Sequence, residues 1–188
     1  MYKLIPNFSL KQNNSFGLDV RSDYWLSLSA PEDWNTAIVR YPHLLEEKKK
    51  IIGGGTNLLF LSDFDGLIIS PDICGYSIAY QDSDIVEISV GAGIEWDDFV
   101  AYCVSNGWCG VENLSLIPGK VGAAAVQNIG AYGVEAATLI TKVDGYNMET
   151  SRMASFSADQ CRFGYRSSIF KEKMSNTCLL YTSDAADE

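Results

Sequence analysis

The sequence predicts a compact fold that mixes helices and strands, and three observations support this prediction. The chain has 188 residues, of which 47% are hydrophobic, which suits one compact domain or two small lobes with real cores. Helical and strand-like patterns alternate along it. Two glycine-rich segments, at 53–55 and 110–133, interrupt these patterns. Segments so poor in bulky side chains cannot drive folding by burial, so we expect their backbone to lie close to another group.

The first part of the chain carries a strand followed by a helix. Residues 14–17 (NSFG) indicate a turn, and residues 24–28 (YWLSL) indicate a strand. Ser29 and Glu32 have the spacing of a capping box, and apolar residues follow at helical spacing as far as Tyr41. We therefore expect a helix that begins just after Ser29.

The middle of the chain carries two strands and the clearest helix. Residues 67–69 (LII) follow a predicted turn, and residues 86–90 alternate between apolar and polar side chains. Between 94 and 104, apolar residues recur on one helical face that includes Val104. Acidic residues in its first turn and Gly107 at its end complete the pattern of a helix.

The last patterned part begins after the second glycine-rich segment. Residues 143–156 suggest strands around turns. Ser157 and Gln160 again have capping-box spacing, which predicts a short helical turn there.

The charge of the chain disfavours several kinds of partner. The formal net charge is −10, with a single histidine, His43. The one basic run, Lys48–Lys50, is interpreted as a solvated loop, so neither nucleic acid nor an anionic membrane is an expected partner. No apolar run reaches the length of a membrane span, and the first ten residues lack the apolar core of a secretory signal, which indicates a cytoplasmic protein.

The cysteines do not indicate a metal site. No two of them form a CxxC pair, and one histidine cannot complete a zinc site with them. We expect no metal and five reduced thiols that are mostly buried. They are Cys74, Cys103, Cys109, Cys161 and Cys178.

The glycine triplet follows a short apolar strand in IIGGGTNLLF, residues 51–60. Three consecutive glycines let successive backbone N–H groups turn toward one point, which forms a nest for an anion such as a diphosphate. The segment is not a Rossmann fingerprint, because Leu58 stands where the third glycine would be. A plain turn is the alternative interpretation of the triplet.

The second glycine-rich segment, residues 110–133, reads GVENLSLIPGKVGAAAVQNIGAYG. It contains many glycines and alanines and hardly a charge, so its backbone can approach a flat ligand closely. Tight packing of small residues between core elements is the alternative interpretation.

A third motif, CRFGYRSSIF at 161–170, places two arginines and a tyrosine around a glycine. Taken alone, it is explained by a surface arginine lying over aromatic rings. Together, the three motifs resemble the UDP-N-acetylenolpyruvoylglucosamine reductases of bacterial peptidoglycan synthesis in their order, their spacing and the IPG…QNIGAYG…FGYR sequence. The resemblance covers residues 14 to 173.

The resemblance implies an FAD-binding fold of the vanillyl-alcohol oxidase type (the PCMH type), in which two α+β lobes hold the flavin between them. The implied lobes are residues 1–70 and 71–177, the second incomplete. In this family NADPH reduces FAD, and the reduced flavin passes a hydride to the enolpyruvyl group of a UDP-sugar. FAD and NADPH are therefore the expected cofactors and the UDP-sugar the expected small-molecule partner, and the complete enzyme is expected to be a monomer.

The resemblance also assigns site residues by position. Arg166 matches the arginine that stabilises negative charge developing on the substrate, and Tyr165 matches a substrate-contacting tyrosine. The implied FAD contacts are Gly53, Gly54, Gly55, Thr56 and Asn57 around the diphosphate, and Pro118, Gly119, Gly122, Ala123, Gln127, Asn128, Gly130, Ala131 and Tyr132 along the ring system. The chain departs from the family at 123–125, where relatives commonly carry serine or glycine followed by proline.

Two further expectations concern the end of the sequence and the activity. Reductases of this family continue into a third domain with a catalytic serine and glutamate, which cannot be assigned here. Residues 178–188 do not resemble the family; they resemble one reading frame of a transposase sequencing-library adapter, so we expect the native sequence to stop near Thr177. A flavin-binding module without catalysis and a related flavin oxidase of sugars or alcohols are the alternative functions.

Overall fold

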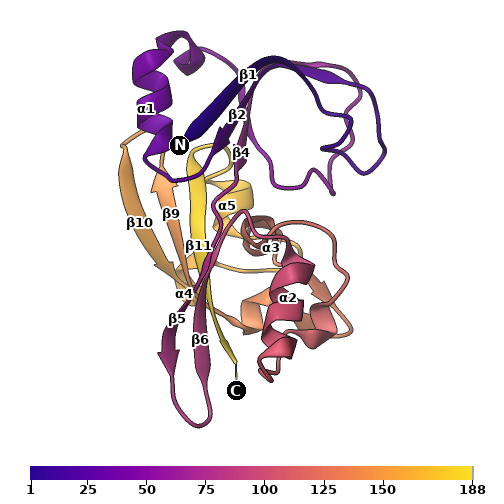
Figure 1. Cartoon of the computed structure of the whole chain (residues 1–188), viewed down its shortest axis with the longest axis vertical. Helices are drawn as coiled ribbons and strands as arrows, with labels where there is room; N and C mark the ends of the chain where they lie inside the picture. Colours follow the sequence, from indigo (N-terminus) through magenta and orange to yellow (C-terminus); the bar gives the residue numbers. More distant parts are fainter. Residues whose placement is uncertain (188) are drawn as a thin grey trace.

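The computed structural model describes residues 1–187, which form two lobes of mixed helix and sheet. Figure 1 shows the sheet of the first lobe and α1 above the longer sheet of the second lobe. The chain passes from one lobe to the other between β4 and β5. The α+β prediction is confirmed.

The first lobe contains a 4-stranded sheet of order β1-β2-β4-β3. Its strands are β1 (Tyr2–Ser9), β2 (Arg21–Leu28), β3 (Lys49–Ile51) and β4 (Phe64–Pro71). Strand β1 pairs with β2 in antiparallel fashion, whereas β2 and β3 both run parallel to β4. Parallel strands require a crossover, and α1 (Asp33–Arg40) with the 3-10 helix η1 (Pro42–Leu45) leads the chain from β2 to β3.

The second lobe contains a 5-stranded antiparallel sheet of order β10-β9-β11-β6-β5. Its strands are β5 (Tyr76–Gln81), β6 (Val86–Gly91), β9 (Ile140–Asn147), β10 (Arg152–Ser157) and β11 (Cys178–Asp187). The remaining elements are α2 (Trp96–Ser105), η2 (Glu112–Leu114), α3 (Val121–Gln127), the small hairpin β7 (Gly130–Ala131) and β8 (Val134–Glu135), η3 (Ala136–Thr138), α4 (Ala158–Cys161) and α5 (Ile169–Glu172). The helix at α2 and the strands at β6, β9 and β10 agree with their predicted positions.

One hydrophobic cluster joins the two lobes. It combines side chains of β2, α1 and β4 with Tyr146, Met148 and Leu179 of the second lobe. The indole Nε1 of Trp34 donates a hydrogen bond to the carbonyl oxygen of Met148, at 3.1 Å. Because buried apolar area is the main stabilising contribution in folding, this cluster fixes the lobes relative to one another.

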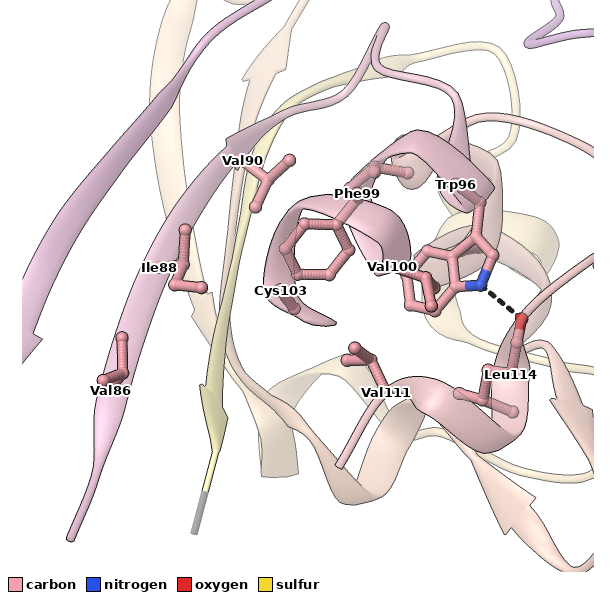
Figure 2. Packing of buried hydrophobic residues seen from close by; sticks show 11 residues of the cluster. Val86, Ile88, Val90, Trp96, Phe99, Val100, Cys103, Val111 and Leu114 are labelled. Atoms are coloured by element: carbon pink, nitrogen blue, oxygen red, sulfur yellow. Dashed lines mark hydrogen bonds between the residues drawn. The ribbon is translucent and has the colours of Figure 1, made fainter. Parts of the chain in front are cut away.

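The core of the second lobe lies between β6 and α2. Val86, Ile88 and Val90 point from β6 toward Phe99 and Cys103 of α2, as Figure 2 shows. Every second residue of the strand is buried, as its alternating sequence predicts.

Trp96 begins α2 and also anchors the loop that leads into the second glycine-rich segment. Its side chain is buried, and its Nε1 donates to the carbonyl oxygen of Leu114 at 2.8 Å (Figure 2). Trp96→Phe keeps most of the ring volume but leaves that carbonyl unpaired, so we expect the free energy of unfolding to fall by about 1–3 kcal/mol. The measurement is urea denaturation, with the exposed Val104→Ala on the same helix as a control that should stay within about 0.5 kcal/mol of the parent chain. Equal stabilities of Trp96→Phe and Val104→Ala would contradict this.

Three local predictions are wrong. Ser29 does not cap α1; instead the carboxylate of Asp33 accepts the amides of Ser29 and Ala30, both at 3.1 Å. Val104 lies outside the buried stripe of α2, with 54% of its surface exposed. Residues 49 and 50 are not in a solvated loop, because they form strand β3 beside β4.

Other local predictions are confirmed. Ser157 and Gln160 form the reciprocal capping box of α4. Three of the five thiols, Cys103, Cys161 and Cys178, are buried, and none of the five takes part in a disulfide bond within the described residues. Burial raises the pKa of the Cys161 thiol to about 11, so it stays protonated at neutral pH.

Strand β11 was not expected, since residues 178–188 do not resemble the family. It lies at the centre of the second sheet and pairs with β6 on one side and β9 on the other. No helix among residues 1–187 is long and apolar enough to cross a membrane.

Candidate functional site

The two glycine-rich segments meet at a cavity between the lobes. The cavity has a volume of ≈ 400 Å³, in the range of small-molecule sites. Residues 50–58 of the first lobe line one side, and Gly122, Ala123, Val126 and Gln127 of α3 line another. Segments about 70 residues apart in the sequence thus form one site.

The glycine triplet has three different environments. Gly55 is buried with φ +68°, and a Cβ on it would lie 1.8 Å from the carbonyl oxygen of Asn13. A Cβ on Gly53 would lie 3.1 Å from the Cβ of Ala123, whereas one on Gly54 would meet nothing closer than 3.4 Å. Only glycine fits at position 55, while Gly53 and Gly54 expose bare backbone at the cavity.

Side chains from both lobes hold the loop in place. The Thr56 hydroxyl donates to the carbonyl oxygen of Pro118 at 3.2 Å, and Asn57 Nδ2 donates to Gln127 Oε1. The Ser15 hydroxyl donates to the carbonyl oxygen of Thr56 at 3.2 Å. These contacts fix the loop against α3 on one side and against the turn at 14–17 on the other.

The charge of the cavity contrasts with that of the chain. Its lining contains two lysines, Lys50 and Lys171, and no aspartate or glutamate among the described residues. The chain as a whole has a net charge of −10, so this positively charged lining favours binding of a negatively charged group in the cavity.

An ion pair lies beside the cavity. Lys120 Nζ is 2.6 Å from Asp72 Oδ1, and the lysine side chain is 14% exposed. Burial alone would raise the pKa of Asp72, but hydrogen bonds from Lys120, Ser27 and Ser70, with the charge of Lys120, lower it below its usual value. The carboxylate is therefore ionised at neutral pH.

Asn128 ends α3 in the left-handed conformation and is completely buried. Its Nδ2 donates to Glu135 Oε2 (2.8 Å) and to the carbonyl oxygen of Gly164 (3.0 Å), and its Oδ1 accepts the amide of Ala137 (2.9 Å). The side chain therefore connects three segments of the second lobe and does not line the cavity.

Arg166 crosses from the FGYR motif to the turn after α3. Its Nη1 donates to the carbonyl oxygen of Asn128 at 3.3 Å and its Nη2 to that of Gly130 at 2.5 Å. Two of the five guanidinium N–H groups serve these carbonyls, which leaves others for a ligand. Tyr165 beside it is 85% exposed, and Tyr132 of the second segment is 92% exposed.

The structure brings together only part of the predicted site. Eight predicted residues line the cavity, namely Gly53, Gly54, Gly55, Thr56, Asn57, Gly122, Ala123 and Gln127. The others lie outside its lining, namely Pro118, Gly119, Asn128, Gly130, Ala131, Tyr132, Tyr165 and Arg166. The Thr56 hydroxyl links Pro118 of this second group to the cavity, whereas the hydrogen bonds of Arg166 to Asn128 and Gly130 lie within the second group.

Sequence reasoning missed several residues of the cavity. Lys50 was grouped with a basic run, although its position just before the glycines is the signal that could have identified it. Lys171 and Asn176 follow the FGYR motif and reach the cavity because α5 packs against α3. No pattern in the sequence shows that packing.

The residues present fit the diphosphate of a dinucleotide such as FAD. Bare backbone at Gly53 and Gly54 permits close approach, lysines are nearby, and no carboxylate among the described residues faces the cavity. Backbone nests and cations are the groups that bind phosphates in proteins.

Comparison with known proteins agrees with this geometry. The family described as "FAD binding domain" matches residues 32–149. The chain is 45% identical over 168 residues to UDP-N-acetylenolpyruvoylglucosamine reductase of Bacteroides fragilis, and 43% identical over 166 residues to that of Porphyromonas gingivalis. These alignments cover 87% and 88% of this chain but 48% and 49% of the relatives, so the chain spans about half their length.

Solved structures show the same fold at low sequence identity. The crystal structure of UDP-N-acetylenolpyruvylglucosamine reductase from Thermus caldophilus matches with a TM-score of 0.77 at 19% identity, covering 100% of this chain and 62% of that one. A p-cresol methylhydroxylase structure matches with a TM-score of 0.59 at 12% identity, covering 89% and 36% of the two chains. The two-lobed FAD-binding fold expected from the sequence is confirmed.

Proposed function

This chain belongs to the family of FAD binding domains, and we propose that it is the flavin-binding part of a UDP-N-acetylenolpyruvoylglucosamine reductase. The observation that carries the proposal is the cavity between the lobes, in which bare glycine backbone and two lysines face a space free of carboxylates among the described residues. Relatives with up to 45% identity that carry this name support the choice of enzyme.

The chemistry that bound FAD supplies is transfer of a hydride from NADPH to the enolpyruvyl double bond of UDP-N-acetylglucosamine enolpyruvate, which yields UDP-N-acetylmuramate for peptidoglycan. The amides of Gly53 to Gly55 bind the diphosphate, and the Asn57–Gln127 hydrogen bond holds the loop closed around it. Arg166 binds the side of the enolpyruvyl group that bears the carboxylate and stabilises the negative charge that develops there. Tyr165 contacts the substrate. The enzyme acts as a cytoplasmic monomer.

The proposal is tested in two stages. Mixing the purified chain with FAD should give a yellow protein with one flavin per chain, and absence of saturable binding would contradict the cofactor assignment. In the full-length protein, NADPH oxidation should then depend on the enolpyruvyl UDP-sugar. Peroxide formation with a sugar or alcohol would instead identify an oxidase.

A second candidate is a flavin-binding module without reductase chemistry. The observation in its favour is that Tyr165 and Arg166, the residues assigned to the substrate, lie outside the lining of the cavity. It predicts bound flavin but no NADPH oxidation when the UDP-sugar is added to the full-length protein.

A further inference from the structure

Lys120 belongs to the second lobe through its backbone. It forms an isolated β-bridge with Glu95, flanked by hydrogen bonds from the amide of Trp96 to Gly119 (2.8 Å) and from the amide of Val121 to Ile94 (2.9 Å). It directly precedes α3, whose residues line the cavity. Displacement of this residue would therefore displace the start of α3.

The side chain of Lys120 reaches the first lobe. Its partner Asp72 directly follows β4 and also accepts hydrogen bonds from Ser27 Oγ at 2.5 Å and Ser70 Oγ at 3.2 Å. The backbone amide of Asp72 donates to the carbonyl oxygen of Leu28 at 2.9 Å. The carboxylate is thus fixed to two strands of the first sheet, and Lys120 is fixed to it.

The same lysine lies beside the glycine loop. A Cβ built on Gly53 would lie 3.6 Å from the Cβ of Lys120 and 3.9 Å from its Cγ. Lys120 therefore lies beside the loop on one wall of the cavity and directly precedes the helix on the other wall. Its side chain is anchored to the sheet that carries the loop.

We propose that Lys120 is a positioning residue for the cofactor: its ion pair with Asp72 holds the Gly53–Asn57 loop at a fixed distance from α3. The cavity then has its binding width before the cofactor arrives. This inference rests on the proposed function, because it takes FAD as the ligand.

A rival role for Lys120 is direct contact with a phosphate. The structure favours positioning, because Lys120 does not line the cavity, whereas Lys50 and Lys171 do. The two roles predict opposite effects of removing Asp72. If Lys120 positions the two walls of the cavity, loss of the Asp72 carboxylate weakens FAD binding. If the freed lysine binds a phosphate of FAD instead, FAD binding stays unchanged or becomes stronger.

The test is a titration of FAD into Lys120→Met, Asp72→Asn and the double variant, with flavin fluorescence as the readout. The titration is carried out at a temperature at which circular dichroism shows that each variant is folded. If the fraction of molecules whose cavity has the width needed to bind FAD falls to about a tenth, the apparent dissociation constant for FAD rises about tenfold. We expect this rise in both single variants and no further rise in the double variant. Lys142→Met, which removes the ion pair with Asp144 (3.3 Å), is the matched control and should bind as the parent chain does.

One further readout, the melting temperature, tests whether the two side chains act as a pair in the protein without cofactor. Without FAD, the two single variants should lower the melting temperature by similar amounts, and the double variant by no more. Unchanged FAD affinity in both variants, or a loss in Lys120→Met alone, overturns the positioning role while FAD binding by the parent chain stands. Absence of FAD binding by the parent chain overturns the proposed function and this inference together.

Discussion

Gly55→Ala is expected to lower the free energy of unfolding by about 3 kcal/mol or more and to abolish stable flavin binding. The new Cβ would lie 1.8 Å from the carbonyl oxygen of Asn13, and φ at this position is +68°. A strained backbone conformation costs about 1–3 kcal/mol, and overpacking a buried site costs a further 1–3 kcal/mol. Because the atom opposite is backbone, no side-chain rotation can relieve the clash.

The measurement is urea denaturation of Gly55→Ala and Gly54→Ala without cofactor. Gly54→Ala is the matched control, since its Cβ would meet only the Thr56 methyl at 3.4 Å and Gly119 Cα at 3.7 Å, both ordinary contacts. We expect the control to unfold at nearly the same urea concentration as the parent chain. Equal stability of the two variants would show that the loop is not held against Asn13.

If the proposed reductase function holds, Arg166→Ala is expected to slow reduction of the enolpyruvyl group by on the order of 10²-fold, the size of effect seen when a charge-stabilising donor is lost. Flavin binding and NADPH oxidation by the flavin are expected to remain. Single-turnover absorbance measurements separate these two half-reactions. The arginine also supports the turn after α3 by bonding the carbonyls of Asn128 and Gly130, so both rates must be compared.

Arg162→Ala is the matched control for Arg166→Ala. Arg162 lies in the same motif, is exposed, and has positive φ as Arg166 does. We expect both half-reactions to be unaffected in it. Equal slowing of the two half-reactions in Arg166→Ala would show that this arginine only supports the turn.

Much of the fold can be predicted from local patterns in the sequence. The alternation at 86–90 identifies β6 because one face of the strand is buried. The capping box at Ser157 identifies the start of α4, since its hydrogen bonds are local. The spacing at Ser29 predicted a capping box that does not form, because the carboxylate of Asp33 accepts the Ser29 amide that Glu32 would accept in such a box, and the Ala30 amide as well.

The parts that could not be predicted depend on contacts between distant segments. Helix α3 (VGAAAVQ) has Gln127 at its end as its one polar residue, so it has no repeating helical pattern to detect, and packing against neighbouring elements stabilises it. Strand β11 is recognised only by its pairing with β6 and β9.

The candidate site, like the fold, could be predicted where it depends on local sequence and not where it depends on contacts between distant segments. The glycine loop was found from its composition, because bare backbone requires glycine. The Lys120–Asp72 pair joins residues 48 positions apart, and no local pattern indicates it. The arginine and tyrosine of the FGYR motif were assigned through resemblance alone, and their roles stay predictions.

The most direct test of the central claim is a fluorescence titration of FAD against the purified chain and against Gly54→Ala. We predict saturable binding by the parent chain with one flavin per chain, and clearly weaker binding by the variant at unchanged stability, because the added methyl group keeps a phosphate away from bare backbone. Equal binding by both, or no saturable binding by the parent chain, would contradict the claim that the glycine loop between the lobes holds the flavin.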